Sequence, residues 1–143
     1  MYHMVRFDVR GRYGMNQRDI VLLLALGLAI WVAGSIYYAY RGPAILETTA
    51  VRYWIAFALS PIASAVLCIA ILRWRRIPAA DWAPAMLLLA IPGMIGEAVV
   101  LSHLRIFMPR LQAASGGRYG AFLFAAYALA LAIAEAVTLR ATT

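Results

Sequence analysis

Four apolar runs, each long enough to cross a lipid bilayer, constrain this chain more than any other feature of its sequence. They cover residues 20–40, 53–72, 82–104 and 119–139. A helix rises about 1.5 Å per residue, so about 20 apolar residues reach across a hydrocarbon core about 30 Å thick. The connections between the runs are short. The sequence therefore predicts an all-α integral membrane protein, a four-helix bundle whose helices run antiparallel in sequence order.

The composition excludes an ordinary soluble domain. The chain is 65% hydrophobic and 13% charged, whereas a soluble domain is about half apolar and a quarter charged. Its net charge of +7 comes from arginine alone, because the sequence has no lysine. Basic chains often bind nucleic acid, but these arginines lie almost entirely between the apolar runs, where membrane proteins keep them. We therefore expect the lipid bilayer as a partner, and no nucleic acid.

Arginine counts bear on the orientation of the chain. An even number of spans places both termini on one side, and the connections on that side hold eight arginines against five on the other. This distribution favours termini in the cytoplasm. We expect residues 1–15 to form a flexible head outside a single transmembrane domain of residues 16–143. If Met15 is the true start, the head is not native and the count becomes five against five.

One carboxylate interrupts the third run. Within "LLLAIPGMIGEAVVL", residues 87–101, Glu97 is the only charged residue. A charge near the bilayer centre costs about 3 kcal/mol on insertion scales. We therefore expect Glu97 to face the bundle interior and to find a hydrogen-bond partner there. Counting depth along antiparallel helices predicts a polar layer of Glu97, Tyr127, Ser60 and Ser35, or a trapped water in place of one partner.

Two further features concern the helices themselves. Pro61 in the second run and Pro92-Gly93 in the third each predict a helix kink, because proline leaves a backbone carbonyl without its hydrogen bond. Glu135 lies near the end of the fourth run, where we predict an ion pair with Arg140 at the cytoplasmic end. The tyrosines at 37, 38 and 40 are typical of anchors at the headgroup level.

The sequence gives no support for catalytic or metal chemistry. His3 and His103 have no neighbouring Cys, Asp or Glu at ligand spacing, and Cys68 is the single cysteine. No Ser/His/Asp set and no pair of carboxylates within one run is present. We therefore expect no enzyme activity, no metal and no cofactor.

Two functions stay open. Intramembrane acids often handle protons or solutes, which makes the chain a candidate small proton-coupled solute transporter with Glu97 in the bundle interior. The alternative is a non-catalytic structural or accessory membrane subunit in which Glu97 makes a packing hydrogen bond. Either protein could form a homo-oligomer or join a larger membrane partner.

Short motifs in three of the runs resemble those of a known family. They are Trp-x-x-Gly at residues 31–34, Pro-Gly-Met at 92–94 with an acid at 97, Phe-x-Pro at 107–109, and a tyrosine at 127. Proteins with similar motifs form a family of small bacterial four-span membrane proteins catalogued as a domain of unknown function. The resemblance covers roughly residues 16–139. It implies four helices in a bacterial inner membrane, and it implies no activity.

Overall fold

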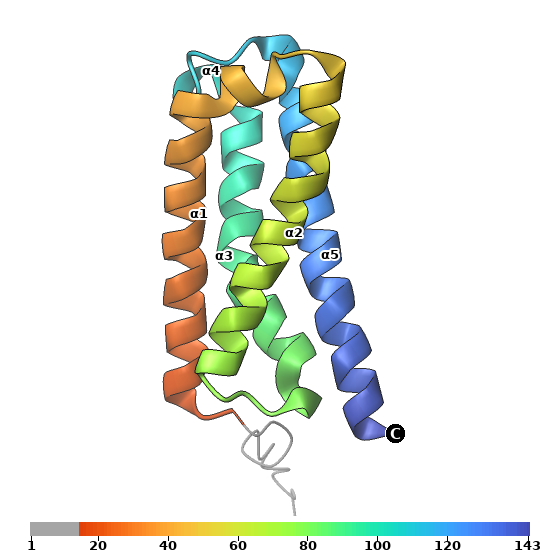
Figure 1. The fold of residues 1–143 in the computed structure, drawn as a ribbon. Coiled ribbons are helices and arrows are strands. Elements are labelled where there is room, and N and C mark those ends of the chain that lie inside the picture. Colours follow the sequence, from red (N-terminus) through yellow and green to blue (C-terminus); the bar gives the residue numbers. More distant parts are fainter. Residues whose placement is uncertain (1–14) are drawn as a thin grey trace, which may run out of the picture.

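Four long helices run up and down in chain order. The computed structural model describes residues 15–143; residues 1–14, the greater part of the expected head, lie outside the described residues. The long helices are α1 (Gln17–Leu46), α2 (Ala50–Trp74), α3 (Trp82–Ser102) and α5 (Gly116–Thr142), and the short α4 (Leu104–Phe107) lies between the last two (Figure 1). Single 3₁₀ turns, Ala79–Asp81 and Ala113–Ser115, precede α3 and α5. The described residues form no strand, and the expected all-α four-helix bundle is confirmed.

Several helix boundaries differ from those read from the apolar runs. α1 continues beyond residue 40 and through Gly42-Pro43, which the sequence assigned to a connection, because the carbonyl of Pro43 still accepts the Glu47 N–H at 3.0 Å. α3 ends two residues earlier than expected, at Ser102, and α5 begins three residues earlier, at Gly116. Met15, which we placed in the head, packs against buried side chains of the bundle.

Prolines lie inside three of the long helices. Pro61 is buried within α2 and Pro92 is half-buried within α3, and both helices continue as α-helices on either side of the proline. The bends predicted at Pro61, Pro92 and Gly93 stay predictions, because helix continuity alone does not measure a bend.

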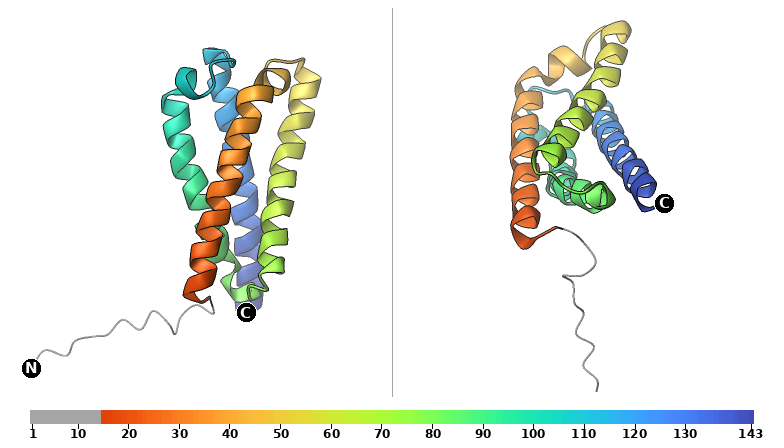
Figure 2. Two further views of the ribbon diagram at one scale, coloured as in Figure 1. Left: turned by 90° about the vertical axis from the view of Figure 1, so that its left-hand side faces the viewer. Right: turned by 60° about the horizontal axis from the view of Figure 1, so that its bottom comes forward.

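The helices pack as two pairs. α1 lies along α3, α2 lies along α5, and the two pairs meet mainly where α3 contacts α5 (Figure 2). α1 and α2 contact one another little, although a short turn joins them. α1 and α3 approach each other closely at Gly27, where a Cβ atom would clash with the backbone of Leu89. Glycine at this position therefore lets α1 and α3 lie against each other.

The outer faces of the bundle carry the apolar surface that a membrane protein needs. Only 11–17% of the residues in the apolar windows of α1, α2 and α5 are buried, against 39% in the third span, so the third helix is the central one. Large side chains such as Leu59 and Phe124 are 60% and 74% exposed. Extensive apolar surface of this kind is rare on soluble monomers. All four helices are long and apolar enough to cross a bilayer, and the chain is a multi-pass membrane protein.

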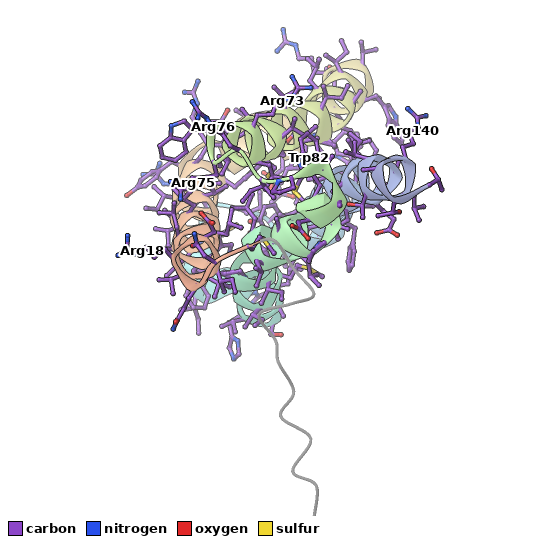
Figure 3. The ribbon with its side chains drawn as sticks, turned by 90° about the horizontal axis from the view of Figure 1, so that it is seen from below. Arg18, Arg73, Arg75, Arg76, Trp82 and Arg140 are labelled. Carbon is purple, nitrogen blue, oxygen red and sulfur yellow. The ribbon has the colours of Figure 1, made fainter. Side chains whose placement is uncertain are left out.

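Arginines mark both ends of the bundle. Within residues 15–143, the end that carries the C-terminus holds five of them (Figure 3): Arg18, Arg73, Arg75, Arg76 and Arg140. The opposite end, which we call the α4 end, also holds five: Arg41, Arg52, Arg105, Arg110 and Arg118. None lies near the middle of a span, so the centre of the bundle contains no arginine.

The ion pair at the C-terminal end is not the one predicted. Asp19 at the start of α1 pairs with Arg75 after α2, at 2.5 Å. Within the described chain Glu135 and Arg140 form no ion pair. Residues five apart lie about 140° from each other around a helix, whereas pairs three or four apart share a face. The five-residue spacing therefore keeps the side chains of Glu135 and Arg140 on different faces of α5.

Candidate functional site

The carboxyl of Glu97 lies inside the bundle and is held by α5. Glu97 is 6% exposed. The hydroxyl of Tyr119 donates to the carboxyl, 2.9 Å from Oε1 and 3.0 Å from Oε2. Tyr119, on α5, is itself fully buried, and its side chain contacts α1 and α3. The hydrogen-bond partner is therefore a residue that the sequence analysis did not select.

The helix boundaries explain why Tyr119 was missed. The apolar runs placed Tyr119 at the very start of a helix and Glu97 past the midplane. In the structure Glu97 lies about 7.5 Å from the end of α3 and Tyr119 about 4.5 Å from the start of α5, so both have a similar depth near the α4 end. Tyr127 lies about 12 Å further along α5. Starting the fourth helix at Gly116 would have revealed the pair.

Contacts at the α4 end fix the start of α5 and so the position of Tyr119. The carboxylate of Glu47 accepts hydrogen bonds from the Gln112 N–H at 2.6 Å and from the Ser115 hydroxyl at 2.9 Å. The guanidinium of Arg118 donates to the carbonyl of Leu46 at 2.8 Å and lies 4.9 Å from the centre of the Tyr53 ring. These contacts tie the first turn of α5 to the end of α1.

Ser60 joins the site through another tyrosine. The hydroxyls of Tyr38 on α1 and Ser60 on α2 lie 2.9 Å apart and share a hydrogen bond. The rings of Tyr38 and Tyr119 pack edge to face, with their centres 5.2 Å apart. Tyr38, which the sequence suggested as a headgroup anchor, therefore lies inside the bundle and links α1, α2 and α5.

Two buried donors beside the carboxyl lack a well-formed hydrogen bond in the described chain. Ser35 and Trp31, both on α1, lie near Glu97. Both lie close enough to the Glu97 carboxyl to interact with it, but within the described chain neither the Ser35 hydroxyl nor the indole nitrogen of Trp31 makes a hydrogen bond of good geometry. A buried unsatisfied donor costs about 1–3 kcal/mol, and such groups often await a ligand or water.

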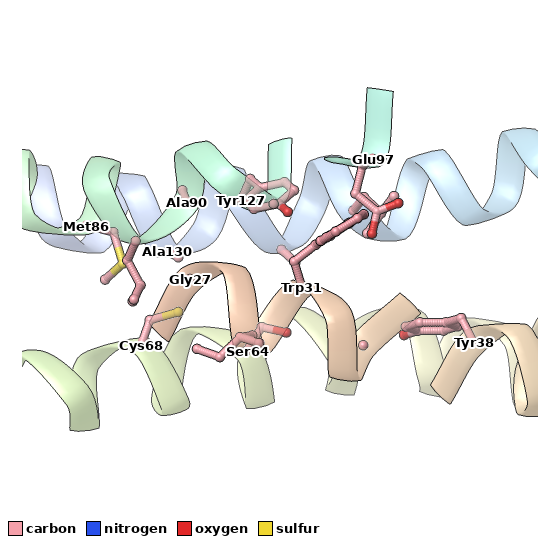
Figure 4. A pocket seen from close by; sticks show the side chains of 16 residues that line it. Gly27, Trp31, Tyr38, Ser64, Cys68, Met86, Ala90, Glu97, Tyr127 and Ala130 are labelled. Atoms are coloured by element: carbon pink, nitrogen blue, oxygen red, sulfur yellow. The ribbon is translucent and has the colours of Figure 1, made fainter. Parts of the chain in front are cut away.

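Glycines on α3 make room for Trp31. A Cβ atom at Gly96 would clash with the Trp31 indole, and one at Gly93 would clash with the hydroxyl of Tyr127. Figure 4 shows the Trp31 ring pointing from α1 toward Glu97. Tyr127 therefore lies one turn away from the carboxyl along α3, against Gly93, rather than bonded to Glu97.

These side chains surround a cavity at the centre of the bundle. Its volume is about 140 Å³, and all four long helices line it (Figure 4). At about 30 Å³ for each water molecule, this volume corresponds to roughly five water-sized groups. The lining is mostly aliphatic, and its polar or aromatic members are Trp31, Tyr38, Ser64, Cys68, Glu97 and Tyr127.

Glu97 also borders a groove on the outside of the bundle. This groove lies between α3 and α5, and Phe124, which is 74% exposed, forms part of its wall. Glu97, Leu123 and Tyr127 line both the groove and the central cavity. A wall one side chain thick therefore separates the cavity from the lipid-facing surface.

The other predicted site residues lie elsewhere. Glu135 is exposed and lines a shallow groove with Pro84 and Leu87 near the C-terminal end. The structure therefore does not bring Glu135 or Arg140 to the cavity. Residues 15–143 contain no group of three or more His, Cys, Asp or Glu side chains able to hold a metal ion.

Substitution of Tyr119 tests the hydrogen bond at the centre of the site. Tyr119→Phe keeps the ring and its packing but removes the hydroxyl that donates to the buried carboxyl, so we expect the free energy of unfolding in micelles to fall by about 1–3 kcal/mol. The matched control is Tyr37→Phe, because Tyr37 is exposed and its hydroxyl makes no hydrogen bond within the described chain. Equal stability of the two variants would contradict the structural role of the bond.

Comparison with known proteins places the chain in a family. A model described as a family of unknown function (DUF5367) matches residues 45–141. The matched segment holds Glu97, Tyr119 and Tyr127, while most of α1 lies outside it. No curated protein and no solved structure matches the chain. Because the match covers more than half of the sequence, the expectation drawn from the motifs is confirmed, and the chain belongs to this family of unknown function, DUF5367.

Proposed function

We propose that this multi-pass membrane protein is a small proton-coupled solute carrier in which Glu97 binds a proton and a solute. The observation that carries the proposal is a buried carboxyl that lines a central cavity beside two buried donors without a well-formed hydrogen bond. An intramembrane carboxyl is most often part of a proton or solute pathway. The proposal assigns the protein no catalytic activity, metal or cofactor, and no nucleic-acid partner.

The surroundings of Glu97 favour coupling between a proton and a solute. In the described chain each arginine lies at one or the other end of the bundle. Within these residues no ion pair involves Glu97. An ionised carboxylate without a counter-charge in an apolar interior is costly. In the proposal the resting carboxyl holds a proton, and a solute that compensates the charge displaces it. Binding of the two is then linked through one group.

The packing of the helices supports a moving site. A carrier has to open one site to each side of the membrane in turn. The α1–α3 pair and the α2–α5 pair meet mainly along the contact between α3 and α5. In the proposal the two pairs rock about this contact, and the Tyr119–Glu97 hydrogen bond crosses it.

The packing hydrogen bond itself favours the accessory-subunit alternative. Tyr119 reaches both oxygens of Glu97, and the close approach at Gly27 stabilises α1 against α3 in one arrangement. In that reading the exposed apolar faces contact a second copy or a larger membrane partner. Measurements on Glu97 variants separate the carrier from the accessory subunit. If Glu97 is purely structural, its substitution changes the stability of the protein alone.

Flux in proteoliposomes tests the carrier. Vesicles holding a pH-sensitive dye and an imposed pH gradient receive tetramethylammonium, methanesulfonate or glucose as cationic, anionic and neutral probes. We expect one probe to dissipate the gradient with the wild type. Glu97→Gln keeps a hydrogen-bonding group of the same shape but cannot exchange a proton, so the response should be lost while the protein stays folded.

Glu135→Gln is the matched control, because Glu135 is a spanning-helix carboxyl outside the cavity; it should respond as the wild type does. If no probe dissipates the gradient in the wild type, and Glu97→Gln is as stable as the wild type while Glu97→Leu is less stable, the accessory reading replaces the carrier.

We further propose that the protein lies in a bacterial inner membrane with its termini in the cytoplasm. The motif resemblance and the arginine count over the whole chain support this placement. In a Cys68→Ser background, Thr143→Cys should react with a membrane-impermeant thiol reagent only from the cytoplasmic side, and Gln112→Cys only from the opposite side. The reverse pattern would overturn the orientation.

A further inference from the structure

We infer that the cavity beside Glu97 binds a small monovalent organic cation, such as a quaternary ammonium group. The inference rests on the proposed carrier function and names its substrate class. Four properties of the cavity lead to it: the sign of its charge, its aromatic lining, its size and its unpaired donors.

The charge in the cavity has one sign. Glu97 is the only acidic residue that lines it, and no basic residue does. The arginines of the described chain lie at the two ends of the bundle, and none of them lines the cavity. In surroundings of low dielectric constant a single carboxylate favours a single positive charge and disfavours an anion.

The lining favours an organic cation over a metal ion. A divalent metal needs several oxygen, nitrogen or thiolate ligands, and the described residues hold no such group. The cavity presents instead the rings of Trp31, Tyr38 and Tyr127. Aromatic faces attract ammonium groups, and cages of aromatic rings recognise quaternary ammonium ligands in other proteins. In Figure 4, the Trp31 ring points from α1 toward Glu97.

The size of the cavity limits the ligand. A volume of about 140 Å³ corresponds to roughly five groups of the size of a water molecule or a methyl. Tetramethylammonium is of that size. Larger cations require the helices to separate.

The two buried donors beside Glu97 are suited to the state of the site in which a cation is bound. When a cation displaces the proton of Glu97, the carboxylate gains capacity to accept hydrogen bonds. The Trp31 indole and the Ser35 hydroxyl are buried beside the carboxyl, and neither makes a well-formed hydrogen bond in the described chain. We assign them to the ionised carboxylate, so that Tyr119, Trp31 and Ser35 hold it while the cation neutralises its charge.

Isothermal titration of the full chain in lipid nanodiscs tests the inference. Tetramethylammonium chloride is the probe, and tert-butanol is a neutral molecule of similar shape and size. We expect saturable binding of tetramethylammonium at one site per chain and no binding of tert-butanol. Glu97→Gln should weaken tetramethylammonium binding at least tenfold, and Glu135→Gln should leave it unchanged.

A second variant keeps the inference testable if Glu97→Gln folds poorly. Gly34 lines the cavity, and a Cβ atom there would meet no atom within 4 Å. Gly34→Leu should therefore occupy part of the cavity and abolish binding while Glu97 stays intact. The matched control is Gly117→Leu, because Gly117 has equally open surroundings but lies outside the cavity.

Binding should weaken as the pH falls, because protons compete for Glu97. The other titratable groups that face the site are Tyr38 from α1, Cys68 from α2, and Tyr119 and Tyr127 from α5. Tyrosine and cysteine side chains in water are neutral below about pH 8. A loss of affinity between pH 7.5 and 5 would therefore report on Glu97, and Glu97→Gln should remove it.

The outcomes separate this inference from the carrier proposal. Absence of tetramethylammonium binding, equal binding of tert-butanol, or unchanged binding in Gly34→Leu would overturn the cation site. If methanesulfonate or glucose nevertheless dissipates the pH gradient through Glu97, the carrier stands and only its substrate class is wrong. Tetramethylammonium binding without any flux would support the site and overturn the carrier.

Discussion

The hydrogen bonds from Tyr119 to Glu97 join α5 to α3 inside the bundle, across the contact on which both helix pairs depend. A carboxyl in hydrocarbon without a partner costs several kcal/mol, so the bundle has to supply one. It does so by anchoring the start of α5. Glu47 and Arg118 hold that turn against the end of α1, and this places the Tyr119 hydroxyl at the depth of Glu97.

Around this bond the structure combines tight packing with an unfilled centre. Gly27 and Gly96 let α1 approach α3 closely and seat Trp31 between them. Yet the middle of the bundle keeps a cavity of about 140 Å³, although interiors usually pack with few voids. A bundle selected only for stability would fill that space and pair its donors. The open cavity, the unpaired donors and the carboxyl occur together, and this coincidence is the reason for preferring a binding role to a packing role.

The sequence predicted the number, type and order of the long helices, because length and hydropathy determine membrane spans almost alone. It also singled out Glu97 as the polar residue to explain. The predicted side-chain contacts were wrong where a shift of a few residues changes which side chains meet. Shifts of two and three residues in the ends of α3 and α5 changed the partner of Glu97 from Tyr127 to Tyr119. Tyr38 could not be assigned from one sequence, because tyrosines near a span end can face either the headgroups or a neighbouring helix.

Infrared difference spectroscopy of the full chain in lipid tests the central claim most directly, namely that one buried carboxyl exchanges a proton for a cation. The C=O stretching band of protonated Glu97 is assigned by its loss in Glu97→Gln. We predict that this band is present at neutral pH and shifts in Tyr119→Phe, which removes its hydrogen-bond donor. Adding tetramethylammonium should make the band disappear as a carboxylate band grows. A protonated band that does not change with tetramethylammonium, or no such band at any pH at which the protein is folded, would contradict the account.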